Sequence, residues 1–385
     1  MFSGLKTDQL RNFVLVTASN FFFFCNYSSF FLLPLFINSL GGNKETVGFI
    51  MGTFGITSFG SIPLVSFLID KYGRRRFTLF GSLLMCLASL SFISINELSP
   101  YLYLLRLIQG VGFAFFFTST TTSAADIIPS EMRGQGLGIF GAFTIASYAL
   151  GPTIGEAVIY KLGFYYFFVV SSLFSLVAFI LVLFTRDTDF TPAEDPYGIK
   201  FFRLAFSRRY AVLLLTNLIL ASGFGSVLNF ISVFLRSKKL EIFYFFLIYT
   251  VTVTCIRILG GRLSDIFSRK GIASPSLLIF SLSIAAVTLI DSFYMVVIVS
   301  LLFSIGYGML YPTLSALVVD KSALDERGKA IGAFNACFSI GINYPTFVFG
   351  IIAERFGFEV MYIISAIVVF IGFIIFSHFE TNKIT

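Results

Sequence analysis

Long apolar runs recur along almost the whole chain, and they constrain its fold more than any other feature. A helix that crosses a bilayer needs about 20 mostly apolar residues. Twelve such runs occur, six before a polar break and six after it. They span residues 13–37, 47–69, 77–95, 101–127, 134–160, 164–184, 210–235, 242–263, 273–290, 293–319, 330–353 and 360–376. The sequence therefore predicts an all-α membrane protein with twelve transmembrane helices.

Composition supports this class, because 57% of the 385 residues are hydrophobic and only 12% are charged. A soluble domain carries about 25% charged residues. The runs are unbroken rather than alternating, and longer than the roughly ten residues of a barrel strand, which disfavours a β-barrel. The first run exceeds the 7 to 15 apolar residues of a signal peptide, so we expect it to be a retained span.

Lys and Arg are distributed unevenly along this pattern. If the N-terminus is cytoplasmic, 19 of the 27 basic residues fall in cytoplasmic segments and six in outer segments, while Arg106 and Arg257 lie within spans. The positive-inside rule then predicts that both termini are cytoplasmic, in what we expect to be a bacterial inner membrane. The net charge of +7 indicates topology and attraction to anionic lipid rather than binding to nucleic acid.

Cysteine and histidine are too sparse for a metal site. Cys25, Cys86, Cys255 and Cys337 lie in apolar runs without a CxxC pair, so we expect small buried hydrophobes and neither a metal nor a disulfide. The single histidine, His378, ends the last run. The sequence also contains neither a nucleophile motif nor a phosphate-binding Gly-Lys loop, which argues against an enzyme.

A polar stretch divides the chain into two similar halves. Residues 186–209 contain two prolines and predict a cytoplasmic linker between six-helix bundles at 1–185 and 210–385. The segment DIIPSEMRG, which begins at Asp126, has a counterpart in DKSALDERG, which begins at Asp320, 194 residues later. Parallel repeats of this kind are typical of transporters whose substrate site lies at the repeat interface.

Three motifs resemble the signatures of the major facilitator superfamily, namely SFLIDKYGRRR (66–76), RLIQGVG (106–112) and GPTIGE (151–156). The family writes the first as G-x-L-x-D-K/R-x-G-R-K/R-K/R. Here Ser66 replaces the leading glycine, whereas Asp70, Gly73, Arg74 and Arg75 match. A second-half copy keeps Gly261, Leu263 and Asp265 but has Ser268 in place of the later glycine. The resemblance spans essentially the whole chain and implies a two-bundle transporter.

The resemblance also implies a conformational latch at the cytoplasmic edge. In the family, the residue equivalent to Asp70 caps a helix of the opposite half, and the residue equivalent to Arg74 pairs with an acid where Asp126 stands here. A carboxylate is favoured at a helix N-terminus by about 0.3 to 1 kcal/mol, and this latch would stabilise the outward-open state. The other expected members are Gly73, Arg133, Asp265, Arg269, Asp320 and Arg327. Alternatively, these charges only determine topology.

Arg106 and Gln109 lie one turn apart within the fourth span. A charge within hydrocarbon costs at least about 2.5 kcal/mol, so Arg106 should face protein or water. Glu156 is expected at a similar depth on the fifth span. We hypothesise that it is the counter-ion of Arg106, for which a proton and a substrate compete. A permanent structural pair, or a Glu156 exposed at the outer rim, is the alternative.

GPTIGE resembles the G-P-x-x-G-G core of the antiporter signature, with Glu156 in place of the second glycine. Gly151, Pro152 and Gly155 match, and they predict a kink and close helix contacts. The resemblance implies export by antiport, although the change at Glu156 weakens that inference.

Polar residues at helical spacing could line a cavity. They also fit ordinary hydrogen bonds between helices, since a polar face in such a bundle turns away from lipid. The candidates are Asn20, Tyr27 and Tyr148 in the first half and Ser304, Tyr307, Tyr311, Asn335, Ser339, Asn343 and Thr346 in the second.

These observations predict a monomeric, proton-coupled exporter of a small organic molecule that works by alternating access without a cofactor. Its expected partners are the substrate, protons and membrane lipid. Because the first span contains no acid, the substrate is expected to be neutral, zwitterionic or anionic. Two alternatives remain: an importer or facilitator of a small metabolite such as a sugar or organic ion, and a transport-inactive sensor on the same scaffold.

Overall fold

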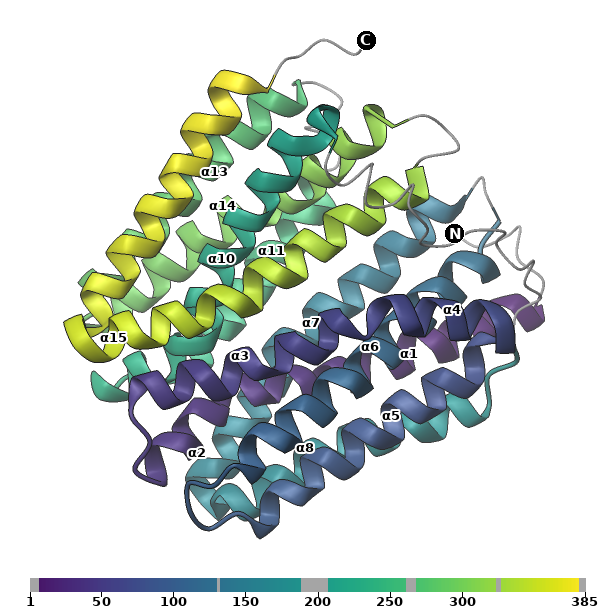
Figure 1. Ribbon diagram of the computed structural model, residues 1–385, viewed down its shortest axis with the longest axis horizontal. Helices are drawn as coiled ribbons and strands as arrows, with labels where there is room; N and C mark the ends of the chain where they lie inside the picture. The colour runs from purple at the N-terminus through teal and green to yellow at the C-terminus, as the bar shows by residue number, and fades with distance from the viewer. Residues whose placement is uncertain (1–6, 130–131, 188–206, 261–267, 323–326, 381–385) are drawn as a thin grey trace. The chain divides into compact units, whose positions relative to one another are not determined.

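The computed structural model describes residues 7–129, 132–187, 207–260, 268–322 and 327–380, with the backbone alone at positions 63, 70, 133–135, 208, 258–260 and 327–329. This described part is helical and contains no strand, so the predicted all-α class is confirmed (Figure 1). The elements in chain order are α1 (Thr7–Ser29), η1 (Phe30–Leu32), α2 (Leu33–Ser39), α3 (Lys44–Gly60), α4 (Ile62–Tyr72), α5 (Arg74–Ser91), η2 (Phe92–Ser94), α6 (Tyr101–Ile127), α7 (Arg133–Leu162), α8 (Phe164–Leu183), α10 (Arg208–Ser237), α11 (Ile242–Gly260), α13 (Arg269–Ala286), η4 (Val287–Leu289), α14 (Phe293–Asp320) and α15 (Arg327–Phe379).

Nine described stretches are long and apolar enough to cross a membrane. One of them, within α15, holds the last two predicted spans, which fold back on each other about Gly357, where φ is 92° (Figure 1). The second predicted span is divided into α3 and α4, with Ser61 between them and a proline in the first turn of α4. The eighth is α11, whose apolar part is shorter. All twelve predicted spans are thus accounted for.

Internal repetition is visible in the backbone as well as in the motifs. Gly163 ends α7 with φ 86°, and Gly357 turns α15 with φ 92°, 194 residues later. Both residues combine this φ with an extended ψ, a conformation that is essentially restricted to glycine. The same glycine turn therefore joins the last two spans of each half.

The chain forms two compact units, one comprising Met1–Phe36 with Ile56–Pro196 and the other Ile37–Gly55 with Tyr197–Thr385. This division differs from the predicted halves in one place, because residues 37–55 group with the second unit. Gly48 of α3 lies against Gly350 of α15, and a Cβ built on Gly48 would stand 2.7 Å from the Gly350 Cα. The Lys44 backbone N–H donates to Glu354 at 2.9 Å. The absence of side chains at both glycines permits this close helix contact.

In the first unit, α1 packs against α7 and α8, and α5 packs against α6 and α8. Aromatic residues fill much of the space between them. Phe23 of α1 stacks on Phe116 of α6 with ring centroids 3.8 Å apart, and both side chains are fully buried.

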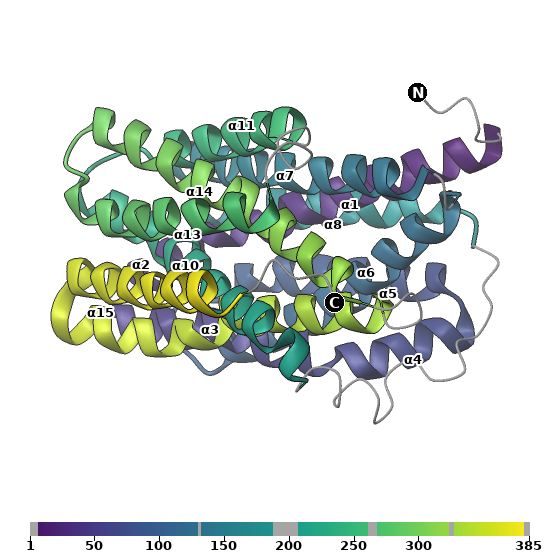
Figure 2. The same cartoon turned by 90° about the horizontal axis from the view of Figure 1, so that it is seen from above.

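In the second unit, α10 packs against α15, and α14 packs against both α11 and α13. Figure 2 shows α11, α14 and α13 running side by side. The prediction that all cysteines are buried is confirmed for Cys25 and Cys86, whereas Cys337 is only half-buried and Cys255 of α11 is exposed. It shares one helix face with the exposed Val251, one turn earlier. Apolar side chains on a membrane helix need not be covered by protein, since lipid is as apolar as a protein core.

Candidate functional site

The candidate site of the first unit is built on the contact between α5 and α6. Gly81 and Gly112 let these helices approach closely, and a Cβ on Gly81 would lie 2.5 Å from the Phe116 nitrogen and 2.7 Å from the Gly112 oxygen. Gly112 is the last residue of the RLIQGVG motif. Polar side chains of α5 and α6 meet on either side of this contact, one group at the start of α5 and the other near its end.

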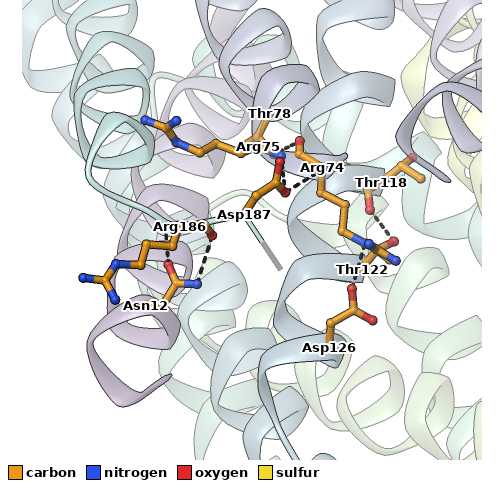
Figure 3. A network of polar contacts seen from close by, with 9 residues as sticks. All are labelled: Asn12, Arg74, Arg75, Thr78, Thr118, Thr122, Asp126, Arg186 and Asp187. Carbon is orange, nitrogen blue, oxygen red and sulfur yellow. Dashed lines mark hydrogen bonds and ion pairs between the residues drawn. The ribbon is translucent and has the colours of Figure 1, made fainter. Parts of the chain in front are cut away.

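At the start of α5, the Arg74 Nε lies 2.7 Å from the Asp126 Oδ2 at the end of α6 (Figure 3). The two side chains are 7% and 29% exposed, respectively. The pairing expected from the family resemblance is therefore present. Because one partner is buried and the other only partly covered, solvent screens this pair less than a surface ion pair.

Asp187, four residues beyond α8, caps the start of α5. Its Oδ1 accepts hydrogen bonds from the backbone N–H groups of Arg74 at 3.1 Å and Arg75 at 3.3 Å. Gly73, which precedes the helix, has φ 89° and ψ 161°, and a Cβ built there would lie 2.5 Å from the Asp187 Oδ2. A glycine at this position thus satisfies two requirements, an unusual backbone conformation and room for the capping carboxylate.

The same neighbourhood includes the end of α8. Arg75 donates through Nη2 to the Leu183 carbonyl at 2.7 Å and through Nε to the Val182 carbonyl at 3.3 Å. These carbonyls lie in the last turn of a helix, which leaves such groups without intrahelical partners and favours a cation. Arg74 and Arg75 therefore connect three helices, α5, α6 and α8.

The second unit contains a corresponding ion pair, because Arg269 Nη1 of α13 lies 2.9 Å from the Asp320 Oδ2 at the end of α14. Its side chains are 33% and 30% exposed, respectively. Here the helix start is capped locally, since the Ser268 Oγ accepts from the Gly271 N–H at 3.1 Å. Ser268 stands where the first-half motif has Gly73. The serine that departs from the motif thus supplies the cap that Asp187 provides in the first unit.

Four expected latch residues have side chains outside the described part of the structure. Asp265 lies beyond the described residues, and Asp70, Arg133 and Arg327 are described by their backbone only. Their expected roles remain predictions.

Near the opposite end of α5, a buried polar network extends from α6 to α1. The Arg106 Nη1 donates to the Gln109 Oε1 at 2.9 Å, and the Gln109 Nε2 donates to the Ser89 Oγ at 3.2 Å. Asn26 of α1 donates to Ser89 at 3.0 Å and to the Ser171 carbonyl at 2.6 Å. Arg106 is 4% exposed and Gln109 is fully buried. The chain thus maintains a charged group buried within a span, in the second turn of α6.

Aromatic rings adjoin this network. The Tyr27 ring lies 4.9 Å from Phe113 and 6.2 Å from Tyr148, measured between ring centroids. Asn20, which we expected on the same face of α1, is fully buried and donates to the Thr144 Oγ1 of α7 at 2.7 Å. Tyr27 and Tyr148 therefore lie together beside Phe113 of α6, whereas Asn20 makes a contact between helices.

The glycines of the GPTIGE motif in α7 lie against α1 or its continuation. Pro152 is inside the helix, and the Ser29 Oγ of α1 donates to the Gly151 carbonyl at 3.2 Å. A Cβ on Gly151 would collide with Ser28, and one on Gly155 would approach Leu32 to 2.9 Å. Glu156 is half-buried in the next turn. Its hypothesised pairing with Arg106 remains a prediction.

The second-unit candidates separate into two groups. The Tyr311 hydroxyl donates to the Asn335 Oδ1 at 3.0 Å, which links α14 to α15, and Tyr307 stacks on Phe224 with centroids 4.2 Å apart. By contrast, Asn343 donates to the Ser339 carbonyl of its own helix at 2.8 Å. Tyr307, Tyr311 and Asn335 therefore belong to one aromatic and polar cluster.

Sequence reasoning missed Asn26 and Asp187. Asn26 carried a usable signal, because a fully buried amide in the middle of an apolar run requires a partner. Asp187 carried no such signal, since it lies in the predicted linker and caps a helix more than a hundred residues away in sequence.

Comparison with known proteins agrees with this architecture. The sequence profile described as Major Facilitator Superfamily matches residues 15–341 and 240–383. Multidrug resistance protein 1 of Bacillus subtilis is 24% identical over 341 residues, covering 83% of this chain and 84% of that protein. The staphylopine export protein of Staphylococcus aureus is 23% identical over 377 residues, covering 91% of each. The solved structure of the nucleoside transporter NupG shares 14% identity at a TM-score of 0.78, covering 98% of this chain and all of that one.

Proposed function

Because the chain belongs to the major facilitator superfamily, a family of transporters rather than enzymes, we propose that this multi-pass membrane protein is a proton-coupled exporter of a small organic molecule. The observation that carries the proposal is the buried network of Arg106, Gln109 and Ser89. A buried arginine in a spanning helix is costly, and intramembrane ionisable groups of this kind are typical of substrate or proton pathways.

Export is favoured over import by two further observations. Two relatives that match most of the chain are named as a multidrug resistance protein and a staphylopine export protein. Helix α7, with Pro152 inside it and Gly151 packed against α1, carries most of the motif associated with antiport. Import is the second candidate, because Glu156 replaces the last glycine of that motif.

In the proposed mechanism, the binding site opens alternately to each side of the membrane. Protons moving down their gradient drive the solute outward, with Glu156 as the proposed coupling carboxylate and both termini in the cytoplasm. The ion pairs Arg74–Asp126 and Arg269–Asp320 form in one conformation and loosen in the other, which would make them conformational latches rather than static supports.

The direction of transport can be tested in everted membrane vesicles. A thermal-shift screen of the purified protein against metabolites, sugars and lipophilic drugs first identifies a ligand, since ligand at 100 times its dissociation constant stabilises a protein by about 2.7 kcal/mol. Vesicles with an acidic lumen should then accumulate that ligand, and a protonophore should abolish the accumulation. Accumulation only in vesicles with an alkaline lumen would instead establish import, and accumulation independent of pH would exclude proton coupling.

A further inference from the structure

Arg186, which precedes the capping residue Asp187, is held by the side chain of Asn12 in the second turn of α1 (Figure 3). The Asn12 Oδ1 accepts from the Arg186 backbone N–H at 3.0 Å, and the Asn12 Nδ2 donates to the Arg186 carbonyl at 3.1 Å. An asparagine amide carries both an acceptor and donors, so one side chain pairs with both backbone groups of one residue. These two bonds together fix the orientation of the Arg186 backbone.

The side chain of Arg186 makes a second contact with α1. Its Nη1 lies 3.0 Å from the Asp8 Oδ2, one turn before Asn12, but these two side chains are 71% and 70% exposed, respectively. Ion pairs that are exposed to this extent contribute little to stability. The amide of Asn12, which is half-buried, is therefore the stronger of these two attachments to α1.

Asp187 reaches the start of α5 from this anchored position. Its Oδ1 accepts from the backbone N–H groups of Arg74 and Arg75, which lie in the first turn of the helix and have no intrahelical acceptor. A cap that is supplied by a distant segment is weakened by the conformational entropy lost when that segment is ordered. Asn12 lowers this cost, because it already holds the neighbouring residue.

The contacts form a continuous path from α1 to the end of α6. Asn12 binds the Arg186 backbone, and the adjacent Asp187 caps α5. The first residue of α5, Arg74, is bound twice, through its backbone N–H by Asp187 and through its side chain by Asp126. Figure 3 shows these side chains in one neighbourhood. A displacement of Asp187 would therefore act on the residue that makes the ion pair.

We propose that Asn12 is a positioning residue, which holds the Asp187 carboxylate at the start of α5 by binding the backbone of Arg186. The N-terminal helix thereby controls the position of Arg74 and the strength of its ion pair with Asp126. The regulatory part of this inference rests on the proposed transport function, because it concerns the latch. The positioning itself concerns contacts within one compact unit and can be tested without transport.

Hydrogen exchange of the Arg74 and Arg75 backbone amides measures the cap directly. Mass spectrometry with fragmentation resolves these two positions in the purified full-length protein in detergent. Asp187→Ala should speed their exchange by about fivefold, as expected for the loss of a helix cap. Asn12→Ala should speed it by about threefold to fivefold, because the capping carboxylate remains but is no longer held in place.

The double variant shows whether one residue acts through the other. If Asn12 acts through Asp187, Asn12→Ala should not speed exchange further in an Asp187→Ala background. A general loss of stability would also speed exchange in the middle of α6, which the positioning role leaves unchanged. The comparison therefore separates positioning from an ordinary contribution to folding.

Matched variants test which group of Arg186 is held. Arg186→Ala removes the ion pair with Asp8 but keeps the backbone groups that Asn12 binds, so it should change the exchange rates by less than about twofold. Arg11→Ala, at an exposed neighbour on α1, should have no effect. Asn12→Asp keeps the size and the acceptor of the side chain but cannot donate to the Arg186 carbonyl when ionised. It should behave like Asn12→Ala, and it decides the question if Asn12→Ala does not fold.

Unchanged exchange at Arg74 and Arg75 in the Asn12 variants would overturn the proposal, and so would effects of Asn12→Ala and Asp187→Ala that multiply in the double variant. The conformational consequence is measured separately, because Asn12→Ala should shift the resting population in the same direction as Arg74→Ala. Faster exchange with an unshifted population would support the positioning role and count against the latch alone.

Discussion

Arg74 Nε and Asp126 Oδ2 lie 2.7 Å apart and join the start of α5 to the end of α6. Arg269 and Asp320 make the same kind of contact between α13 and α14 at 2.9 Å. The aspartates are 194 residues apart and the arginines 195, so both copies of the repeat have kept the pair. The two pairs differ mainly in the burial of the arginine. The Arg74 side chain is 7% exposed and that of Arg269 is 33% exposed, whereas the aspartates are similar at 29% and 30%. Equivalent pairs should therefore differ in strength.

The first prediction concerns this difference in strength. Arg74→Ala should lower the free energy of unfolding by about 2 kcal/mol, since it leaves a partly buried carboxylate without its partner. Arg269→Ala should cost about half as much, because solvent screens that pair more strongly. Equilibrium unfolding in mixed detergent micelles measures both values.

Double-mutant cycles separate the pairwise energies from other effects of truncation. The coupling energy of Arg269 with Asp320 should fall more with added salt than that of Arg74 with Asp126. Arg76→Ala, which removes an exposed arginine of the same motif, should stay within about 0.5 kcal/mol of the wild type. Zero coupling between Arg74 and Asp126 at low salt would refute an energetic role for that pair.

The second prediction treats the first pair as a latch. If it stabilises the outward-open state, Arg74→Ala should shift the population inward. In a background lacking the four native cysteines, Asn335→Cys and Ala157→Cys provide exposed reporters that are expected toward the inner and outer ends, respectively. Reaction with a membrane-impermeant maleimide should rise at position 335 and fall at 157. Equal labelling with and without the Arg74 substitution would leave only a structural role for the pair.

The third prediction concerns the cap of α5. Asp187→Ala removes the acceptor for two backbone N–H groups and should cost about 1 kcal/mol of stability. Asp187→Asn keeps an oxygen acceptor and should cost much less stability than Asp187→Ala. The comparison separates the contribution of the hydrogen bonds from that of the negative charge. Thermal unfolding of both variants gives the comparison, and equal losses would show that charge, not capping, is what Asp187 contributes.

Gly73→Ala extends this prediction, because φ 89° and ψ 161° are unfavourable for alanine by about 1 to 3 kcal/mol. Its new Cβ would also meet the Asp187 carboxylate at 2.5 Å. The double variant Gly73→Ala with Asp187→Ala should therefore lose less unfolding free energy than the sum of the losses in the two single variants. Strict additivity would show that the two positions do not contact each other.

The fold could be predicted from the sequence because each span must satisfy its own backbone hydrogen bonds and present about 20 apolar residues. The break at Ser61 was missed, although the proline that follows was a signal for it. Grouping of residues 37–55 with the second unit could not be predicted. It depends on the contact of Gly48 with Gly350, and nothing near either glycine in the sequence identifies its partner.

The candidate site could be predicted where charged and polar residues occur at helical spacing or in a recognisable motif. The pairing of Arg74 with Asp126 followed from a family motif, and the two are in contact. Arg106 and Gln109 were placed one turn apart on the same span and are hydrogen-bonded, although Glu156 was the partner expected for Arg106. Asp187 reaches α5 only through the tertiary fold, so local sequence could not reveal it. Arg257 was recognised as a charge within a span, but its place beside α14 became apparent only from the packing of Ile256 against Gly308.

The last prediction concerns the proposed coupling acid. Glu156→Gln keeps the size of the side chain but cannot exchange a proton, so it should abolish proton-driven accumulation in everted vesicles while leaving ligand binding measurable by thermal shift. Glu97→Gln, at an exposed acid between η2 and α6, is the matched control and should transport normally. Because glutamine also removes a negative charge from the last two turns of α7, the decisive readout is the pH dependence of flux rather than its size. A Glu156→Gln protein whose flux keeps the wild-type pH dependence would show that another group carries the proton.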